Sequence, residues 1–252
     1  MSIITVCYNS EKYIRSAIES VFNQTCSDIE YIIVDGGSTD ATMSIVRSYE
    51  ALFNGRMKWV SEKDEGIYDA MNKGIAIATG DIICILNSDD FYTNNSVIAK
   101  VIQCFRKKDI DAVYGDLLYI YANNIDKVQR YWKSGIYKKN AFMWGWMPPH
   151  PAFFVKKTVY KQHGNFNTNF TTAADYEFML RVVHKEHINL DYLSEVLVKM
   201  RVGGKSNQSI KNRMKGNNED QRAWKLNGLR SYWFTGYLKP MRKILQYVRR
   251  PY

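Results

Sequence analysis

Residues 82–90, Ile-Ile-Cys-Ile-Leu-Asn-Ser-Asp-Asp, decide the fold. Five consecutive apolar residues are typical of a strand buried on both faces of a parallel sheet, and the polar residues after them mark its end. Apolar runs at 3–6 and 31–34, and the pair Trp59-Val60, indicate three earlier strands. Because apolar residues at helical spacing lie between these runs, the sequence predicts an α/β fold, Rossmann-like, with a mostly parallel sheet and flanking helices.

The helices expected between these strands have clear apolar stripes. They span 14–22, with Asn9 or Ser10 available as the N-cap, then a segment opened by 38–40, and then 67–78.

The second half of the chain is less regular. Residues 113–121 predict a strand that returns through a turn at 123–124. Residues 144–151 contain two tryptophans, three prolines and a histidine, which indicates a rigid loop before a strand at 152–155. A further helix is expected to begin at 173–177.

Charge is distributed unevenly along the 252 residues, whose net charge is +10. Residues 1–198 hold 21 basic and 23 acidic residues, whereas 199–252 hold 14 basic and two acidic residues. Composition is that of a globular protein, with 46% hydrophobic and 24% charged residues. A nearly neutral body with a cationic tail excludes the class of proteins that coat nucleic acids through a uniformly basic surface.

The sequence has no apolar stretch long enough to span a bilayer. Its first residues run directly into an apolar run at 3–6, which favours a first strand over a signal peptide. Cys7, Cys26, Cys84 and Cys104 are widely spaced. This spacing favours reduced cytosolic thiols over disulfides or a zinc site.

Acidic residues follow three of the expected strands. Asp35 comes after the second strand, Asp64 after the third, and Asp89 with Asp90 after the fourth. Ligands bind at the carboxyl ends of the strands in sheets of this kind. The sequence therefore predicts a binding site at this edge, although a solvated turn is the alternative for each carboxylate alone.

Several motifs, in this order, make the chain resemble family 2 glycosyltransferases with a GT-A fold, in particular bacterial polysaccharide and O-antigen-type sugar transferases. The motifs are Thr5-Val6-Cys7-Tyr8-Asn9, Val34-Asp35-Gly36-Gly37-Ser38-Thr39-Asp40, the segment 61–74, Ala78-Thr79-Gly80-Asp81, Leu86-Asn87-Ser88-Asp89-Asp90, His150-Pro151-Ala152, Ala174-Asp175-Tyr176-Glu177 and Gly203-Gly204-Lys205-Ser206. The resemblance covers residues 1–206.

The resemblance implies a nucleotide-sugar donor, inversion at the anomeric carbon, and Mn²⁺ or Mg²⁺ on the donor diphosphate. Asp89 matches the metal ligand, and an oxygen ligand suits a hard divalent cation. Asn87 stands where the family's acidic triplet normally begins with Asp, which lowers the charge available to the metal.

The resemblance also assigns the donor nucleotide to Val6, Tyr8, Asp35, Asp64, Lys73, Asn87 and Ser88. The residues themselves leave alternatives open. Asp35 can simply form an Asx turn before two glycines, Tyr8 can pack in the core, and Lys73 can be a solvated helix charge.

Asp175 matches the catalytic base that deprotonates the acceptor hydroxyl, with a plain helix N-cap as the alternative. Trp144, Trp146 and His150 precede it and are candidate acceptor-binding residues. Either tryptophan can instead be buried, and the histidine can pack within the loop. Residues 203–206 can bring backbone N–H groups near phosphates.

The expected organisation is a glycosyltransferase domain at 1–206 and a basic amphipathic helical tail at 207–252. Within the domain, 1–115 would bind the nucleotide-sugar and 116–206 the acceptor. Met241, Ile244, Leu245 and Val248 form one apolar stripe flanked by basic residues. Such a helix suits an anionic membrane surface, and packing on the body is the alternative.

Together these features predict a UDP-sugar-dependent enzyme that transfers a hexose or N-acetylhexosamine to a lipid-diphosphate-linked saccharide acceptor in surface polysaccharide synthesis. It would work in the cytoplasm, peripherally on the inner face of the cell membrane, and would bind no nucleic acid. A non-catalytic, membrane-associated module that binds a nucleotide or a sugar is the main alternative. A nucleotidyltransferase is disfavoured because the first strand lacks a glycine-rich basic loop.

Overall fold

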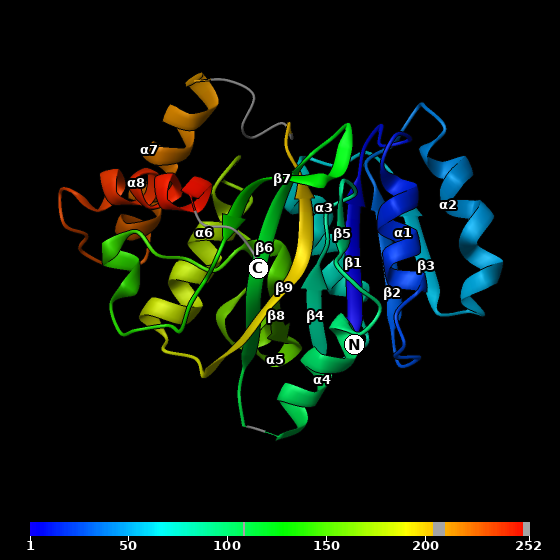
Figure 1. The fold of residues 1–252 in the computed structure, drawn as a ribbon, viewed down its shortest axis with the longest axis horizontal. Coiled ribbons are helices and arrows are strands. Elements are labelled where there is room, and N and C mark those ends of the chain that lie inside the picture. Colours follow the sequence, from blue (N-terminus) through cyan, green and yellow to red (C-terminus); the bar gives the residue numbers. More distant parts are fainter. Residues whose placement is uncertain (108, 204–209, 249–252) are drawn as a thin grey trace.

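One sheet with helices on both faces forms the centre of the protein in the computed structural model, which describes residues 1–107, 109–203 and 210–248 (Figure 1). The strands of this sheet within those residues are β1 (Ser2–Cys7), β2 (Glu30–Asp35), β3 (Met57–Ser61), β4 (Ile82–Ile85), β5 (Asp90–Tyr92), β6 (Ala112–Tyr121), β7 (Asn124–Trp132), β8 (Phe153–Lys156) and β9 (Leu190–Arg201).

The sheet has the order β3-β2-β1-β4-β8-β6-β9-β5, and β7 pairs with β6 as a hairpin. Strands β1 to β4 are parallel neighbours, and β6 and β9 run in the same direction as they do. Strands β5, β7 and β8 run the opposite way. The mixed α/β fold with a mostly parallel sheet is therefore confirmed.

Helices cover the sheet because successive strand residues point to opposite faces. The helices are α1 (Ile14–Phe22), α2 (Thr42–Glu50), α3 (Ile67–Ile77), α4 (Val97–Lys107), α5 (Lys157–His163), α6 (Ala174–Met179), α7 (Ile210–Leu226) and α8 (Thr235–Val248), with short helical turns at Ala51–Phe53, Ala141–Trp144 and His150–Ala152 and a π-helical turn at Leu180–Lys185. Ile3 and Ile33 belong to a core cluster that also contains residues of α1, α2 and α4, whereas Ile4 and Ile32 belong to the cluster that contains residues of α3, α5, α6 and α7.

The strands and helices expected in the first half are present, with small shifts at helix starts. Tyr13, not Asn9 or Ser10, occupies the N-cap position of α1, and its side chain makes no capping bond. Asn9 instead has a left-handed backbone, and its side chain accepts a bond from the Thr39 backbone. It therefore joins two loops rather than starting a helix.

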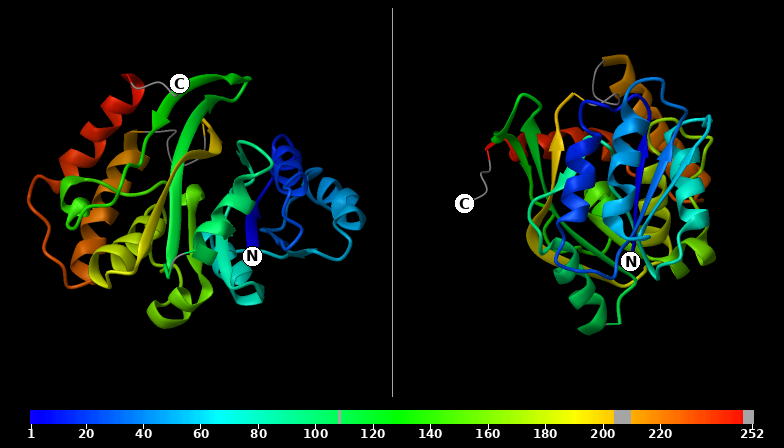
Figure 2. Two further views of the ribbon diagram at one scale, coloured as in Figure 1. Left: turned by 60° about the horizontal axis from the view of Figure 1, so that its bottom comes forward. Right: turned by 90° about the vertical axis from the view of Figure 1, so that its right-hand side faces the viewer.

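The C-terminal helices α7 and α8 pack against the rest of the protein and do not form a detached tail. Ala223 and Trp224 of α7 belong to the main core, and the Glu219 carboxylate accepts bonds from the backbone of Thr171 and Thr172. Helix α8 packs against β7 and the turn Ala141–Trp144. The left view of Figure 2 shows these helices beyond the β6–β7 hairpin, away from the N-terminal half.

No helix in the described part of the chain is both long enough and apolar enough to cross a membrane.

Candidate functional site

The carboxyl ends of the first strands meet at one edge, as their parallel pairing requires. Cys7 at the end of β1 pairs with Asp35 of β2, and Asp35 pairs with Ser61 of β3. The Asp89 turn follows β4, which is the other neighbour of β1. The structure therefore brings the predicted acidic positions to a common edge.

The Asp35 side chain is fully buried, and its carboxylate accepts hydrogen bonds from the turn that follows β2. Its Oδ2 accepts hydrogen bonds from the Ser38 backbone at 3.0 Å and the Ser61 hydroxyl at 2.7 Å, and its Oδ1 accepts one from the Ser38 hydroxyl. These bonds fix the turn at Gly36 and Gly37, so Asp35 has the geometry of the Asx alternative. Val6 is also buried, in β1.

Tyr8, Gly36, Asp64 and Lys73 form one cluster at this edge. A Cβ on Gly36 would lie 3.0 Å from Asp64 Oδ2 and 3.5 Å from Tyr8 Cδ2. The Tyr8 side chain is half exposed, which leaves ring surface for a ligand. Lys73 binds Asp64 at 2.8 Å and Glu62 at 2.9 Å, and these bonds raise the pKa of Lys73. Lys73 is thus a fixed cation rather than a free surface charge.

The turn after β4 contains buried oxygen atoms with unused bonding capacity. Asn87 Nδ2 donates to Asp90 Oδ2 at 2.9 Å, whereas Asn87 Oδ1 and Asp90 Oδ1 have no hydrogen-bond partner among the described residues. The Ser88 and Ser10 hydroxyls lie 3.0 Å apart, which connects this turn to the loop after β1. Unpaired buried oxygens are uncommon and are often found at functional sites.

Arg201, at the end of β9, holds this turn from the other side. Its Nη1 donates to the Asp89 backbone carbonyl at 2.7 Å, and its guanidinium lies over the rings of Tyr13 and Phe91. Burial raises the pKa of Asp89, and the charge of Arg201 opposes that shift. Burial and the charge of Asp89 raise the pKa of Asp90 well above its usual value. Asp89 is the less buried of the two carboxyls.

These residues fit a divalent cation that takes most of its ligands from a substrate. No group of three His, Cys, Asp or Glu side chains comes together among the described residues, so the protein itself does not form a full cage. Asp89 supplies a carboxylate, and the unpartnered Asn87 Oδ1 is an additional oxygen. Mg²⁺-type sites often use one or two carboxylates together with substrate phosphates.

Asp175 lies in the first turn of α6 and is not its N-cap. The N-cap is Ala173, with no side-chain capping bond. Asp175 Oδ1 instead accepts a hydrogen bond from the Tyr68 hydroxyl at 3.1 Å. Burial raises the pKa of Tyr68, and the charge of Asp175 raises it further, so the tyrosine remains a donor. The carboxylate is thereby oriented by a residue of α3.

Tyr119 of β6 is subject to the charges of both the acidic turn and Asp175. Burial raises the pKa of Tyr119, and the negative charges of both Asp90 and Asp175 raise it further. The strand register agrees, because Met200 of β9 pairs with Tyr119 on one side and with Asp90 on the other. Arg130, whose guanidinium lies 3.7 Å from the centre of the Tyr119 ring, opposes both of these charges.

The three aromatic acceptor candidates lie in different environments. Trp146 is buried, and its indole N–H donates to the Ser134 carbonyl at 2.8 Å, so it is a core residue and has no exposed face for a sugar. Trp144 is 54% exposed and contacts the rings of Tyr232 and Phe234. His150 is half-buried; burial lowers its pKa and the charge of Asp175 opposes this.

Sequence reasoning missed Tyr68, Tyr119 and Arg201 as site residues. Tyr68 was within a recognised motif, but only the packing of α3 on α6 shows its bond to Asp175. Arg201 was counted with the tail charges, since nothing local predicts that β9 pairs with β5. Of residues 203–206, those from Gly204 onward lie outside the described part of the chain.

Sequence comparisons identify the family. The sequence model described as Glycosyl transferase family 2 matches residues 2–167. A PGL/p-HBAD biosynthesis glycosyltransferase of Mycobacterium tuberculosis is 28% identical over 218 residues, covering 83% of this chain and 80% of that protein. An uncharacterized glycosyltransferase of the same species is 31% identical over 186 residues, covering 72% of this chain and 68% of its own length. The chondroitin synthase of Escherichia coli is 31% identical over 204 residues, which are 78% of this chain but only 29% of the synthase.

Solved structures of low sequence identity share the fold. The first 349 residues of TarS from S. aureus, in complex with UDP-GlcNAc, have a TM-score of 0.66 at 17% identity and cover 90% of this chain and 70% of their own. A mannosyltransferase from Pyrobaculum calidifontis, in complex with GDP-Man and Mn²⁺, has a TM-score of 0.67 at 17% identity, covering 97% and 69%. The fold is therefore of the GT-A type, and the chain belongs to glycosyl transferase family 2.

Proposed function

We propose that the protein is an inverting glycosyltransferase that moves a hexose or N-acetylhexosamine from a UDP-sugar to a lipid-diphosphate-linked saccharide. The observation that carries this proposal is the acidic turn after β4, where Asn87 Oδ1 and Asp90 Oδ1 are buried with no hydrogen-bond partner among the described residues, at the sheet edge that also holds Asp35. In this proposal the acidic turn binds the donor diphosphate and Asp175 binds the acceptor hydroxyl. The family and the UDP-GlcNAc bound to TarS support a nucleotide-sugar donor.

The donor nucleotide would lie along the carboxyl ends of β1, β2 and β4. Tyr8 offers an exposed ring for the base, beside the Gly36 turn that Asp35 fixes. Lys73 and Asp64 lie at the same edge of the sheet, next to Gly36. Asn87 and Ser88 would contact the ribose and the diphosphate from the turn after β4. Val6 contributes through its backbone, since its side chain is buried.

Asp89, with Asn87 beside it, would hold Mn²⁺ or Mg²⁺ together with the diphosphate oxygens. When bound, the cation would offset the charge that the leaving UDP acquires. Mn²⁺ in the related mannosyltransferase structure supports a divalent metal for this chain. Arg201 fixes the Asp89 backbone, and thereby the position of the turn, through its bond to the carbonyl.

Asp175 acts as the general base in the displacement. Its carboxylate accepts the proton of the acceptor hydroxyl as that oxygen bonds to the anomeric carbon. The bond from this carbon to the diphosphate oxygen breaks, and its electron pair leaves with UDP. Attack opposite to the leaving group inverts the anomeric configuration.

A transfer assay tests this function. The intact protein is incubated with Mn²⁺, a panel of UDP-sugars and a prenyl-diphosphate-linked saccharide, and the products are analysed by mass spectrometry. We expect UDP release and an acceptor heavier by one sugar unit with one of the donors. Donor binding without transfer in the presence of every acceptor would instead favour a non-catalytic module.

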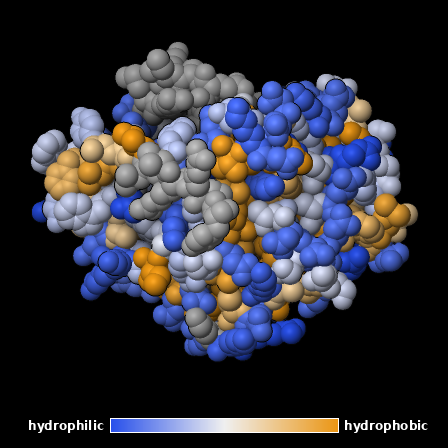
Figure 3. Space-filling model, viewed as in Figure 1, coloured by the Kyte–Doolittle hydropathy of each residue, from blue (hydrophilic) through white to orange (hydrophobic). Residues whose placement is uncertain are grey.

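Helix α8 presents an exposed apolar face, which we propose attaches the enzyme to the inner, anionic face of the cytoplasmic membrane. Tyr237, Met241 and Ile244 are each more than half exposed and fall on one side of the helix. Arg242 and Lys243 are exposed beside them. Figure 3 shows apolar patches at the end of the molecule where Figure 1 has α8. The side chains of Leu245 and Val248, and residues 249–252, lie outside the described part.

Replacing Met241 and Ile244 together by Ser should lower partitioning onto phosphatidylglycerol vesicles at least about tenfold, because two apolar side chains no longer enter the interface. Vesicle sedimentation measures this partitioning. Leu52→Ser is the matched control, since Leu52 is similarly exposed but lies in the N-terminal half. Equal partitioning of the double variant and the wild-type protein would disprove membrane attachment through α8.

A further inference from the structure

A cavity of about 520 Å³ lies between α7, α8 and the loop that joins them, with Gly145 and Tyr176 on its inner side. Its volume falls within the range of small-molecule sites, about 300–1,000 Å³. None of the residues expected to bind donor or acceptor lines it. The site described above therefore does not account for this cavity.

Aromatic rings form much of the cavity wall. Trp224 is buried, and its indole N–H donates to the Tyr176 hydroxyl at 2.9 Å, so these two rings have a fixed arrangement. Tyr232 and Trp233 line the cavity from the connecting loop, where Tyr232 is half exposed and Trp233 is largely exposed. Fixed and accessible aromatic rings together provide the flat apolar surfaces on which C–H faces of a sugar ring can pack.

A buried ion pair provides the polar part of the wall. Asp220 of α7 is 7% exposed, and its Oδ2 accepts a hydrogen bond from Lys239 Nζ of α8 at 2.6 Å. The same ammonium lies 4.0 Å from the centre of the Tyr176 ring. The cavity thus offers a charged acceptor next to a charged donor, and sugar hydroxyl groups can bond to both.

The cavity lies close to the candidate base. Tyr176 directly follows Asp175 in α6, and the negative charge of Asp175 contributes to the raised pKa of Asp220, after burial. Gly145, which lines the cavity, follows the exposed Trp144. A Cβ on Gly145 would lie 2.5 Å from the Lys239 backbone nitrogen, so this glycine permits the close approach of α8.

We propose that this cavity binds a neutral saccharide ring and is the subsite for a sugar unit of the acceptor. The assignment as an acceptor subsite rests on the proposed transferase function. Lys225 and Arg230 also line the cavity, so a phosphate-bearing ligand is the competing occupant that the binding test must distinguish from a neutral ring. Aromatic faces beside a carboxylate–ammonium pair match the alternating apolar and hydroxyl surfaces of a pyranose.

Binding is tested without any nucleotide-sugar, so its result is independent of catalysis. The protein is labelled with ¹⁵N at the tryptophan indoles, and the signals are assigned by Trp→Phe variants. Methyl glycosides of glucose, galactose, mannose, rhamnose and N-acetylglucosamine are then titrated at millimolar concentrations, as expected for ligands of this size. We expect at least one glycoside to shift the signals of Trp224 and Trp233 while those of Trp59 and Trp132 remain unchanged.

Two variants separate a ligand-binding pair from a purely structural link between helices. Asp220→Asn and Lys239→Met should each weaken glycoside binding by about tenfold or more, because each removes a charged hydrogen-bond partner. Lys138→Met is the control, since this exposed lysine does not line the cavity. Circular dichroism establishes that each variant remains folded, and if one unfolds the other provides the test.

Several outcomes would overturn the proposal: no glycoside shifts the cavity tryptophans, both folded variants bind as well as the wild-type protein, or pyrophosphate shifts these signals more strongly than any glycoside. If glycosides bind but no UDP-sugar is ever transferred, the transferase function fails while the saccharide site remains. If transfer occurs and glycosides never reach this cavity, only the subsite is wrong.

Discussion

Asp175→Asn should lower kcat for sugar transfer by about 10²–10⁴-fold, the contribution typical of a positioned general base. The amide is nearly isosteric, and its oxygen can still accept the Tyr68 hydrogen bond that orients the carboxylate. Only the ability to take the acceptor proton is removed. The measurement is steady-state UDP release in the presence of acceptor, together with UDP-sugar affinity, which should be unchanged.

Tyr68→Phe is the companion variant for this prediction. It leaves the base in place but removes the hydroxyl that fixes its orientation, so we expect a smaller decrease in kcat than in Asp175→Asn. If Asp175→Asn retains wild-type kcat, or loses donor affinity and kcat in parallel, Asp175 is not the base. Its role would then lie in donor binding or in structure.

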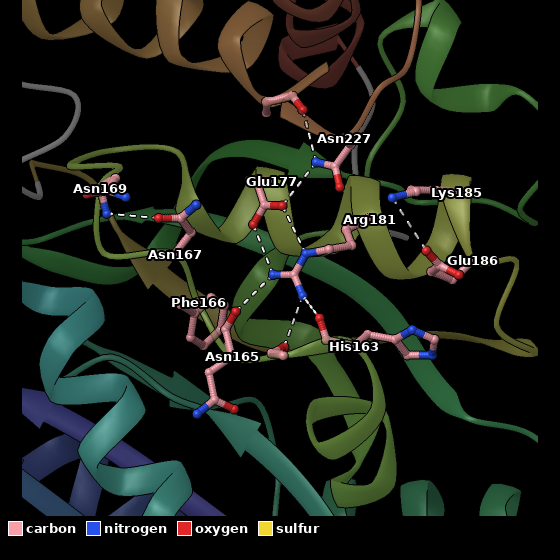
Figure 4. A network of polar contacts seen from close by, with 12 residues as sticks. His163, Asn165, Phe166, Asn167, Asn169, Glu177, Arg181, Lys185, Glu186 and Asn227 are labelled. Carbon is pink, nitrogen blue, oxygen red and sulfur yellow. Dashed lines mark hydrogen bonds and ion pairs between the residues drawn. The ribbon is translucent and has the colours of Figure 1, made fainter. Parts of the chain in front are cut away.

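Glu177 is the centre of a buried polar network that joins α6 to its neighbours (Figure 4). Its carboxylate accepts bonds from Arg181 Nε at 2.9 Å and Nη2 at 3.0 Å, and from Asn227 Nδ2 at 3.0 Å. Arg181 also donates hydrogen bonds to the backbone carbonyls of His163, the last residue of α5, and of Gly164 and Asn165 in the loop after it. The network therefore links α6, the end of α7 and this loop.

Glu177→Ala should lower the free energy of unfolding by about 3–5 kcal/mol, because it leaves the largely buried Arg181 without its counter-charge. Urea denaturation followed by circular dichroism measures the change. The nearby pair of Lys185 and Glu186 provides the control, since its atoms are 3.8 Å apart and both side chains are solvent-accessible. Lys185→Ala should cost only about 0–1 kcal/mol. Equal costs for the two variants would mean that Glu177 does not stabilise the fold as described.

Local sequence patterns sufficed to predict the first half of the fold. The buried run before Asn87 could only be a central strand, and the parallel order of its neighbours then places Asp35 and Asp64 at the same edge. The sequence also allows an Asx turn at Asp35 and a buried side chain at Trp146. Deciding between these roles and ligand binding requires the tertiary contacts of each side chain, which a single sequence does not contain.

The order of the strands in the second half of the chain could not be predicted from sequence, because these strands pair with partners that are distant in the chain. Strand β9 lies between β6 and β5, far from both in the chain, and this placement brings Arg201 to the Asp89 turn. The basic composition of the C-terminal segment also gave no indication that Ala223 and Trp224 pack in the core. The positive net charge of the C-terminal segment therefore indicates that α8 has a basic surface, but it does not define a separate domain.

The most direct measurement of the central claim, that the turn containing Asp89 holds a metal-bound UDP group opposite Asp175, is calorimetric titration of UDP in Mn²⁺ and in EDTA. We predict at least about tenfold tighter UDP binding in Mn²⁺ for the wild-type protein, and no metal effect for Asp89→Asn, because a carboxylate is the ligand such a cation needs. Equal UDP affinity in Mn²⁺ and EDTA, or an unchanged metal effect in Asp89→Asn, would contradict the claim.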